Sequence, residues 1–194
     1  MKRLALSIAA LATVASAVAP ASSRGRYLEP RSAGGMVFPV ARTDWYSVIN
    51  FSNDWHAPRM RLIAGRWRQV GVHEGTDIFA EPGTPVYAIA PGTVERVGWT
   101  FYSGWRVGIR DADGRYSFYA HLASYPDDVW AGRRVSAGAV IGRVGNTGYG
   151  ARPGHRDEFA HHLHVGIQSP GGAWINPYPL LQRLYRAAVD AGPS

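Results

Sequence analysis

The stretch AHHLHVGIQ, residues 160–168, places three histidines within four positions of a segment that otherwise has the composition of a strand. Successive side chains of a strand point to opposite faces, so His162 and His164 share one face and the intervening Leu163 lies on the other. An isolated H-x-H pair usually lies on the solvent-facing side of a sheet. Whether these two imidazoles bind metal or take part in catalysis must therefore be judged from the other motifs of the chain.

A second group of titratable residues lies in VHEGTDIFAEPGTPV, residues 72–86. His73, Gly75 and Asp77 form an H-x-G-x-D pattern, in which we expect the glycine to let the backbone bend so that imidazole and carboxylate converge. Together with one histidine of the H-x-H pair, this segment offers two nitrogen ligands and one oxygen ligand. Three protein ligands and a fourth position for water are typical of a catalytic zinc site, whereas structural sites close all four positions.

One further histidine, His121, ends the predicted strand YSFYAHL, residues 116–122, just before a turn. Alone it would be an ordinary strand-end residue. The full set of candidates is His73, Asp77, His121, His162 and His164. A zinc ion needs only three of these five residues, so two histidines remain for other roles.

Three nearby residues receive no catalytic role. Glu74 is not the glutamate base of an H-E-x-x-H protease, because Asp77 stands where the second histidine is needed. His161 is expected on the face opposite His162, as a structural or rim residue. His155 lies in a predicted loop.

Short β-rich runs alternate with Gly/Pro turns from Ile78 onward. The runs are PVYAIA, GTVERVGW, WRVGIRD, YSFYAHL, AVIGRVG and HLHVGIQ. Their length and spacing favour antiparallel β structure, and Asp113-Gly114 is the strongest hairpin signal among the turns. Only residues 176–192 show helical spacing, with Leu181, Leu184 and Ala188 on one side.

The N-terminal 23 residues have the features of an export signal. Lys2 and Arg3 precede an uncharged Ala/Leu-rich run that is shorter than the roughly 20 apolar residues of a spanning helix. We expect a signal peptide at residues 1–17, a flexible lead-in at 18–36 and one domain at 37–194. The mature chain would then have no transmembrane segment and would be exported, to the periplasm or as a secreted, cell-wall protein.

Composition narrows the chemistry further. The 194 residues include no cysteine, which excludes disulfides, thiolate zinc sites and a cysteine nucleophile. Any metal must be held by nitrogen and oxygen. The formal charge of +7 suits an anionic partner such as a cell-wall polymer. A nucleic-acid partner is not expected, because the arginines are scattered and follow no nucleic-acid motif.

The motifs HEGTD, GTPVYAIAPGTV, YAHL, GNTG and HLHVGI together carry a family resemblance. Over residues 37–177 the chain resembles the LytM/lysostaphin-type zinc metallopeptidases, the M23 peptidase family of cell-wall endopeptidases. The resemblance implies a mainly β fold, an antiparallel sheet or sandwich of the duplicated hybrid motif-like type, with a short C-terminal helix. It assigns one zinc ion per chain to His73, Asp77 and His164, and makes His121 and His162 the catalytic pair.

By this resemblance the protein is an exported zinc metalloendopeptidase that uses zinc-activated water. Its substrate would be the peptide part of peptidoglycan, in stem-peptide crosslinks or in bridges. The sequence does not decide which of His121 and His162 is the general base. Two alternatives remain open: a catalytically silent LytM-like protein that binds cell wall or activates a hydrolase, and a metal carrier that needs neither histidine. The sequence also leaves open whether an activator protein is a partner.

Two segments bear on the substrate. The loop GWTFYSGWR carries Trp99, Phe101, Tyr102 and Trp105, which either wall a groove or pack across a hairpin. Residues 149–161, YGARPGHRDEFAH, replace the short Gly/Ser-rich link that the family usually has before HLHV. This departure leaves the bond specificity open, and the segment is also a candidate lid.

Overall fold

The structure is a computed structural model that describes residues 26–43, 49–156 and 159–190. The expected signal peptide and residues 18–25 of the expected lead-in lie outside these ranges, as do Asp157 and Glu158. The domain boundaries therefore stay predictions. Within residues 26–36 the chain forms a short strand that pairs with the next one, and the following Phe38 and Val40 are buried in the core.

The described residues form thirteen strands and one helix. In chain order they are β1 (Ser32–Ala33), β2 (Met36–Val37), β3 (Pro58–Ile63), β4 (Arg66–Val72), β5 (Thr76–Phe79), β6 (Pro85–Tyr87), β7 (Gly92–Thr100), β8 (Gly104–Asp111), β9 (Tyr116–Ser124), β10 (Arg134–Val135), β11 (Val140–Val144), β12 (His162–Gln168), β13 (Trp174–Ile175) and α1 (Tyr178–Asp190). This composition confirms the prediction of a mainly β fold with a short C-terminal helix.

The main sheet is built on the antiparallel meander β7–β8–β9. The turn between β8 and β9 contains Asp113 and Gly114, and Gly114 has a φ of 82°, a conformation that glycine adopts without strain. The hairpin that this dipeptide predicts is therefore present. All pairings within the sheet are antiparallel, as expected from the run lengths.

The free edge of β9 is shared by two strands. Residues 116–120 of β9 pair with β12, whereas residues 122–124 pair with β11. The other edge of β12 pairs with β5, so two segments more than 80 residues apart in sequence lie side by side. The point where β9 changes its partner falls at His121.

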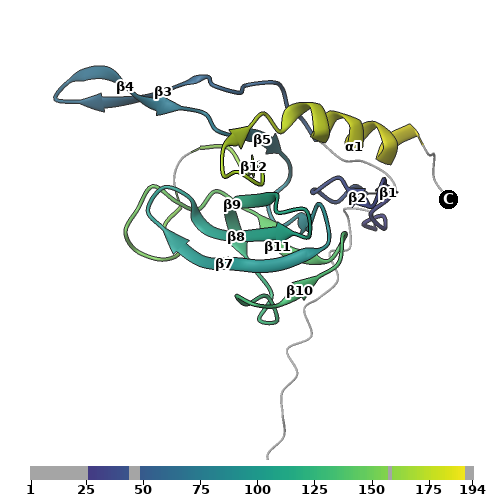
Figure 1. Ribbon diagram of the computed structural model, residues 1–194. Helices are drawn as coiled ribbons and strands as arrows, with labels where there is room; N and C mark the ends of the chain where they lie inside the picture. The colour runs from purple at the N-terminus through teal and green to yellow at the C-terminus, as the bar shows by residue number, and fades with distance from the viewer. Residues whose placement is uncertain (1–25, 44–48, 157–158, 191–194) are drawn as a thin grey trace, which may run out of the picture.

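The core lies beneath these strands and is closed by α1. On β12 the side chains of Leu163, Val165 and Ile167 are fully buried, which confirms the alternation expected from the sequence. The helix buries Leu181, Leu184 and Ala188 and leaves Val189 exposed. Its Tyr185 packs against Phe38 with the ring centroids 5.0 Å apart. Figure 1 shows α1 lying across one side of the sheet.

A β-hairpin of residues 58–72, formed by β3 and β4 and called the arm below, projects from the body of the molecule (Figure 1). Its two strands pair only with each other. Every residue of β4 is exposed, as are all residues of β3 except Arg59. The sequence analysis predicted strands only from Ile78 onward and missed this hairpin, although its arginines alternate with apolar residues as in a strand.

Candidate active site

Three strands bring the predicted site residues together. β12 lies between β5 and β9, and His164 pairs with Asp77 on one side and Ala120 on the other. His73 lies just before β5, where its backbone N–H donates to the carbonyl oxygen of Ala57. The sheet register therefore places residues from three separate motifs at one point.

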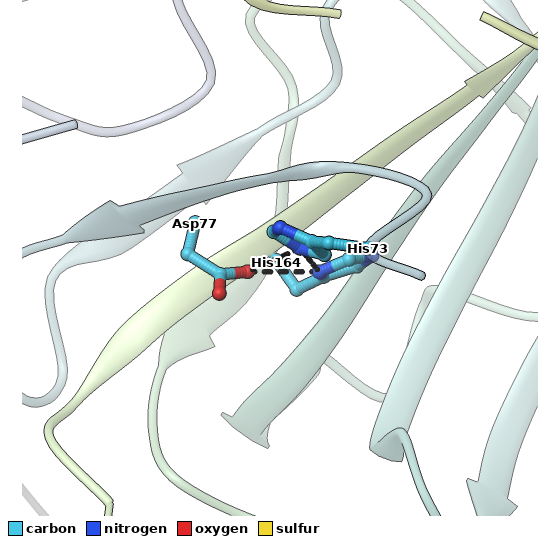
Figure 2. Close-up of side chains that lie close together, drawn as sticks. All are labelled: His73, Asp77 and His164. Atoms are coloured by element: carbon cyan, nitrogen blue, oxygen red, sulfur yellow. Dashed lines mark hydrogen bonds and ion pairs between the residues drawn. The ribbon is translucent and has the colours of Figure 1, made fainter. Parts of the chain in front are cut away.

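His73, Asp77 and His164 direct one donor atom each to a common point, as Figure 2 shows. Asp77 Oδ1 lies 2.8 Å from His164 Nδ1 and 3.1 Å from His73 Nε2. The two imidazole nitrogens lie 3.0 Å apart. A tetrahedral zinc ion with bonds of about 2.0–2.1 Å sets its donors about 3.3 Å apart. Two imidazole nitrogens and a carboxylate oxygen at nearly this spacing fit such an ion.

Gly75 gives the imidazole of His164 the space that it occupies. A Cβ at Gly75 would lie 2.3 Å from His164 Cε1 and 2.7 Å from the carbonyl oxygen of Val165. Gly75 is not among the residues with a positive φ, so the glycine is needed for close approach. The chain does bend at Gly75, as expected, but the close approach of His164 is a second reason for glycine that the sequence analysis did not identify.

His73 has a second carboxylate partner that the sequence analysis did not identify. Asp54 Oδ2 lies 2.8 Å from His73 Nδ1, on the side of the ring away from Asp77. A carboxylate behind a metal-binding histidine fixes its tautomer and orientation. Burial lowers the pKa of His73, but its contacts with Asp54 and Asp77 outweigh burial and raise the pKa to about 9. In the sequence Asp54 follows Asn53 and belongs to no recognisable motif, so no signal pointed to its role.

Asp77 is held as a carboxylate. Burial raises the pKa of its side chain, but the neighbouring His164 and His73 outweigh burial and hold the pKa well below its usual range. Its second oxygen, Oδ2, accepts a hydrogen bond of 3.2 Å from Arg59 Nη2, at the base of the arm. An ionised carboxylate is the form that binds metal.

His121 lies inside β9, so the expectation that it ends a strand was wrong. Its φ of 60° is unusual for a residue with a side chain, and it occurs where β9 exchanges β12 for β11. The ring Nδ1 lies 2.7 Å from the carbonyl oxygen of Thr147. A carbonyl only accepts, so Nδ1 carries the hydrogen and Nε2 keeps its lone pair. Burial and the adjacent His162 lower the pKa of His121 to about 3.

His162 repeats this arrangement. Its Nδ1 donates to the carbonyl oxygen of Ala160 over 2.8 Å, and its Nε2 lies 3.7 Å from Asp77 Oδ1. Burial lowers the pKa of His162. The rings of His121 and His162 lie 4.9 Å apart, beside the three clustered residues. Both histidines are therefore neutral near pH 7, with Nε2 unprotonated.

Thr147, in the GNTG stretch, supports His121 with both its backbone and its side chain. Besides the carbonyl contact, its Oγ1 donates to the carbonyl oxygen of Leu122 over 2.7 Å and accepts from the backbone N–H of Trp105 over 3.1 Å. These bonds fix the loop against β9, which contains His121, and against the neighbouring β8. The sequence analysis used GNTG for the family resemblance and gave Thr147 no role.

Comparison with known proteins agrees with this geometry. The profile described as Peptidase family M23 matches residues 71–177, more than half of the chain. The protein is a member of peptidase family M23. The resemblance stated from the motifs is thereby confirmed.

Named relatives of this family member include the L-Ala--D-Glu endopeptidase of Bacillus subtilis (strain 168), 45% identical over 118 residues. That match covers 59% of this chain and 36% of the relative. The catalytic domain of the antimicrobial peptidase lysostaphin from Staphylococcus simulans is similar with a TM-score of 0.52 at 32% identity, over 69% of this chain and 92% of that chain.

A crystal structure of a lytM protein from Ruminococcus gnavus ATCC 29149 is similar with a TM-score of 0.65 at 36% identity. The match covers 77% of this chain and 60% of that one. These structures confirm the predicted LytM-type fold. The match to this chain spans only 17–36% of the length of the first curated relatives.

The protein has a groove of about 850 Å³ that reaches from the arm to Asp77, His121 and His162. Two residues of the 149–161 segment line it: Tyr149, whose ring is nearly parallel to that of His121, and Phe159, whose centroid lies 5.1 Å from that of His162. Neither residue was singled out from the sequence, although aromatic residues in a loop beside H-x-H were an available signal.

Of the four aromatic residues that the sequence analysis placed either at a groove or across a hairpin, only Tyr102 lines this groove. Trp99 and Trp105 instead pack edge to face, 5.4 Å between centroids, as the hairpin alternative predicts. The three residues left without a role, Glu74, His155 and His161, are not among the described residues that line the groove or form the metal-binding group. Glu74 and His155 are exposed.

Proposed function

We propose that this protein is a zinc metalloendopeptidase that hydrolyses peptide bonds of peptidoglycan. One observation carries the proposal: three metal-binding donors converge at a point that two neutral histidines adjoin, and a groove of about 850 Å³ reaches one of the donors, Asp77, and both of these histidines. Membership in peptidase family M23 supports the same reaction class. The Bacillus subtilis relative, an L-Ala--D-Glu endopeptidase by name, favours a peptide of this type as the substrate.

His73, Asp77 and His164 would hold the zinc ion, with Asp54 orienting His73. When bound, zinc acts as a Lewis acid on the scissile carbonyl and lowers the pKa of water toward neutrality. Three protein ligands leave a position open for water or substrate, as in other catalytic zinc sites. The raised pKa of His73 means that its proton must leave before metal binds.

His121 and His162 would manage the protons of the reaction. Each fixes its Nδ1 hydrogen on a backbone carbonyl, so Nε2 is available to take a proton from water. A protonated Nε2 can then stabilise the oxyanion or donate to the leaving amine. Their lowered pKa values keep both rings in the neutral, base-competent form at pH 7. Which of the two is the base stays open.

Export to the cell wall belongs to the same proposal. It is supported by the signal-like N-terminus and by the basic charge of the chain. In the part of the chain that the structure describes, no helix is both long enough and apolar enough to cross a bilayer.

Mass spectrometry of the peptides released from purified peptidoglycan tests the proposal. We expect new amino termini after incubation with the zinc-loaded protein, their loss with a chelator, and their recovery when zinc is restored. Metal analysis should give one zinc ion per chain. A protein that binds zinc and cell wall but releases no peptide would instead be a silent member of the family, and the proposal would be wrong.

A further inference from the structure

The arm is a cationic, exposed segment beside the active site. Residues 58–72 contain four arginines and no acidic residue. They also carry large exposed apolar side chains, among them Leu62, opposite Trp67 across the hairpin. A surface that combines guanidinium groups with apolar side chains suits a ligand that is partly anionic and partly aliphatic.

The arm forms one wall of the catalytic groove. Arg59, Arg61 and Trp67 line the same cavity as Asp77 and His162. A peptide that lies across the two histidines must therefore pass beside the arm. Because the arm and the two histidines line one cavity, a substrate bound at the histidines can also contact the arm.

The two arginines of this wall differ in their partners. Arg59 is paired with Asp77 and so is engaged by the candidate metal site. Arg61 lies over the ring of Tyr102, with its Cζ 5.8 Å from the centroid and Nη1 3.4 Å from the phenol oxygen. Among the described residues no carboxylate pairs with Arg61. An aromatic face fixes the plane of a guanidinium and leaves its other N–H donors available.

From this arrangement we infer that Arg61 binds a free carboxylate of the peptide substrate, so that the enzyme selects acidic stem peptides over neutral glycine bridges. Guanidinium is the side chain best suited to a planar carboxylate, because it offers two parallel donors. The inference rests on the proposed function and narrows its substrate class. The apolar side chains of the arm would contact the aliphatic parts of the same peptide.

Three substrates test the inference: a synthetic crosslinked stem-peptide dimer, the same dimer with each D-glutamate α-carboxylate converted to a carboxamide, and pentaglycine. We expect kcat/KM for the carboxylate form to exceed that for the amide form by about tenfold, the range of one charge-assisted contact at a partly exposed site. Pentaglycine should be the poorest substrate. The preference should shrink at high salt, because exposed charges are screened.

Variants assign the preference to one side chain. Arg61→Gln should reduce the ratio between the two dimers to near one, mainly through KM, and Arg61→Lys should restore part of it. Arg66→Gln is the matched control, since it removes the same charge from the tip of the arm, outside the residues that line the groove. It should leave the ratio at its wild-type value. Tyr102→Phe, which keeps the ring and removes the phenol oxygen, should also retain most of the preference.

Equal hydrolysis of both dimers by the wild type, or preferred hydrolysis of pentaglycine, would overturn the inference and leave the proposed function intact. Hydrolysis that does not depend on zinc, or no hydrolysis of any of the three substrates, would instead count against the proposed function. If the wild type binds phosphatidylglycerol vesicles, Arg61→Gln abolishes that binding, and the dimer ratio stays the same in both proteins, then the arm serves a membrane surface and the inference is wrong.

Discussion

The floor of the groove and the arm differ in how each holds its functional side chains. The floor consists of β5, β9 and β12, whose site residues are buried or nearly so and are each held by a second contact. The arm is a two-stranded hairpin that pairs only with itself and exposes almost every residue. The proposed chemistry, which needs fixed geometry, would therefore lie in the sheet, and the proposed recognition of the substrate would lie on the exposed hairpin.

This division has a consequence for mutations. Changes in the floor should act on metal binding and on kcat, because they move donor atoms whose spacing is set by the sheet. Changes in the arm should act on KM and on the choice among substrates, with little effect on stability. The variants below test this division in order of decreasing expected effect.

The largest effect is expected for His162→Ala in the floor. Removing a group that transfers protons costs about 10²- to 10⁴-fold in rate, so kcat should fall within this range while zinc stays bound. Metal analysis and kinetics on the same preparation measure the two quantities. The neighbouring His161→Ala is the matched control and should retain most of its activity. Full activity in His162→Ala would show that the floor does not use this imidazole.

Gly75→Ala should produce the next largest effect. The new methyl group would meet the ring of His164 and the backbone of Val165, so the imidazole must move away from Asp77. Disturbing the support of a metal ligand costs about 10- to 100-fold in metal affinity, and we expect the upper end. Gly71→Ala adds the same methyl group in the arm, where it meets nothing within 4 Å. Equal zinc affinity in both variants would contradict the close-approach argument.

Thr147→Val should destabilise the protein by about 2 kcal/mol, because the carbonyl of Leu122 and the N–H of Trp105 both lose their partner. Urea unfolding of the metal-free protein measures this. Thr147→Ser keeps the hydroxyl group and should recover most of the loss. A stable valine variant with unchanged activity would mean that the GNTG stretch does not support His121.

The floor was largely predictable from the sequence. Strand alternation placed His162 and His164 on one face, and the H-x-G-x-D pattern joined His73 to Asp77. Such local patterns predict the site well because the sheet register, which pairs β12 with β5 and β9, depends on the same alternation of side chains. The family resemblance then divided the five residues into ligands and a catalytic pair, a division that remains a prediction.

What the sequence did not predict depends on distant contacts. Asp54 contacts His73 from the segment that precedes β3, and Thr147 contacts His121 from the GNTG stretch. No sequence spacing signals either contact. The arm was missed for a different reason. Its arginines alternate with Met60, Leu62 and Trp67, a strand pattern that the sequence analysis did not follow upstream of Ile78. This alternation predicts a half-buried strand, whereas the structure exposes both faces of the hairpin.

A pH titration of zinc affinity tests the protonation of His73 in the floor. The pKa of His73 is raised to about 9 in the metal-free protein, so metal must displace a proton at lower pH. Zinc affinity should therefore rise by about tenfold per pH unit between pH 7 and 9, as measured by competition with a chromogenic chelator. Over the same range the metal-free protein should lose stability, because the contribution of protonated His73 is complete below pH 6.5 and disappears through pH 9.

Asp54→Asn is the control for that titration. It removes one of the two carboxylates that raise the pKa of His73, so the rise in zinc affinity should level off at a lower pH. Asp77 stays ionised over the whole range because its pKa is lowered, and it adds no slope of its own. An affinity that is independent of pH would show that His73 is not the protonated group.

The smallest effect is expected in the arm, for Trp67→Ala. This side chain is 68% exposed, and surface substitutions of this kind change stability by less than about 0.5 kcal/mol. Leu163→Ala in the floor, where the side chain is fully buried, should cost about 3 kcal/mol in the same unfolding experiment. If Trp67→Ala destabilised the protein as much as Leu163→Ala, the arm would be part of the folded core. The separation of recognition from chemistry would then fail, because no change in the arm could leave the floor undisturbed.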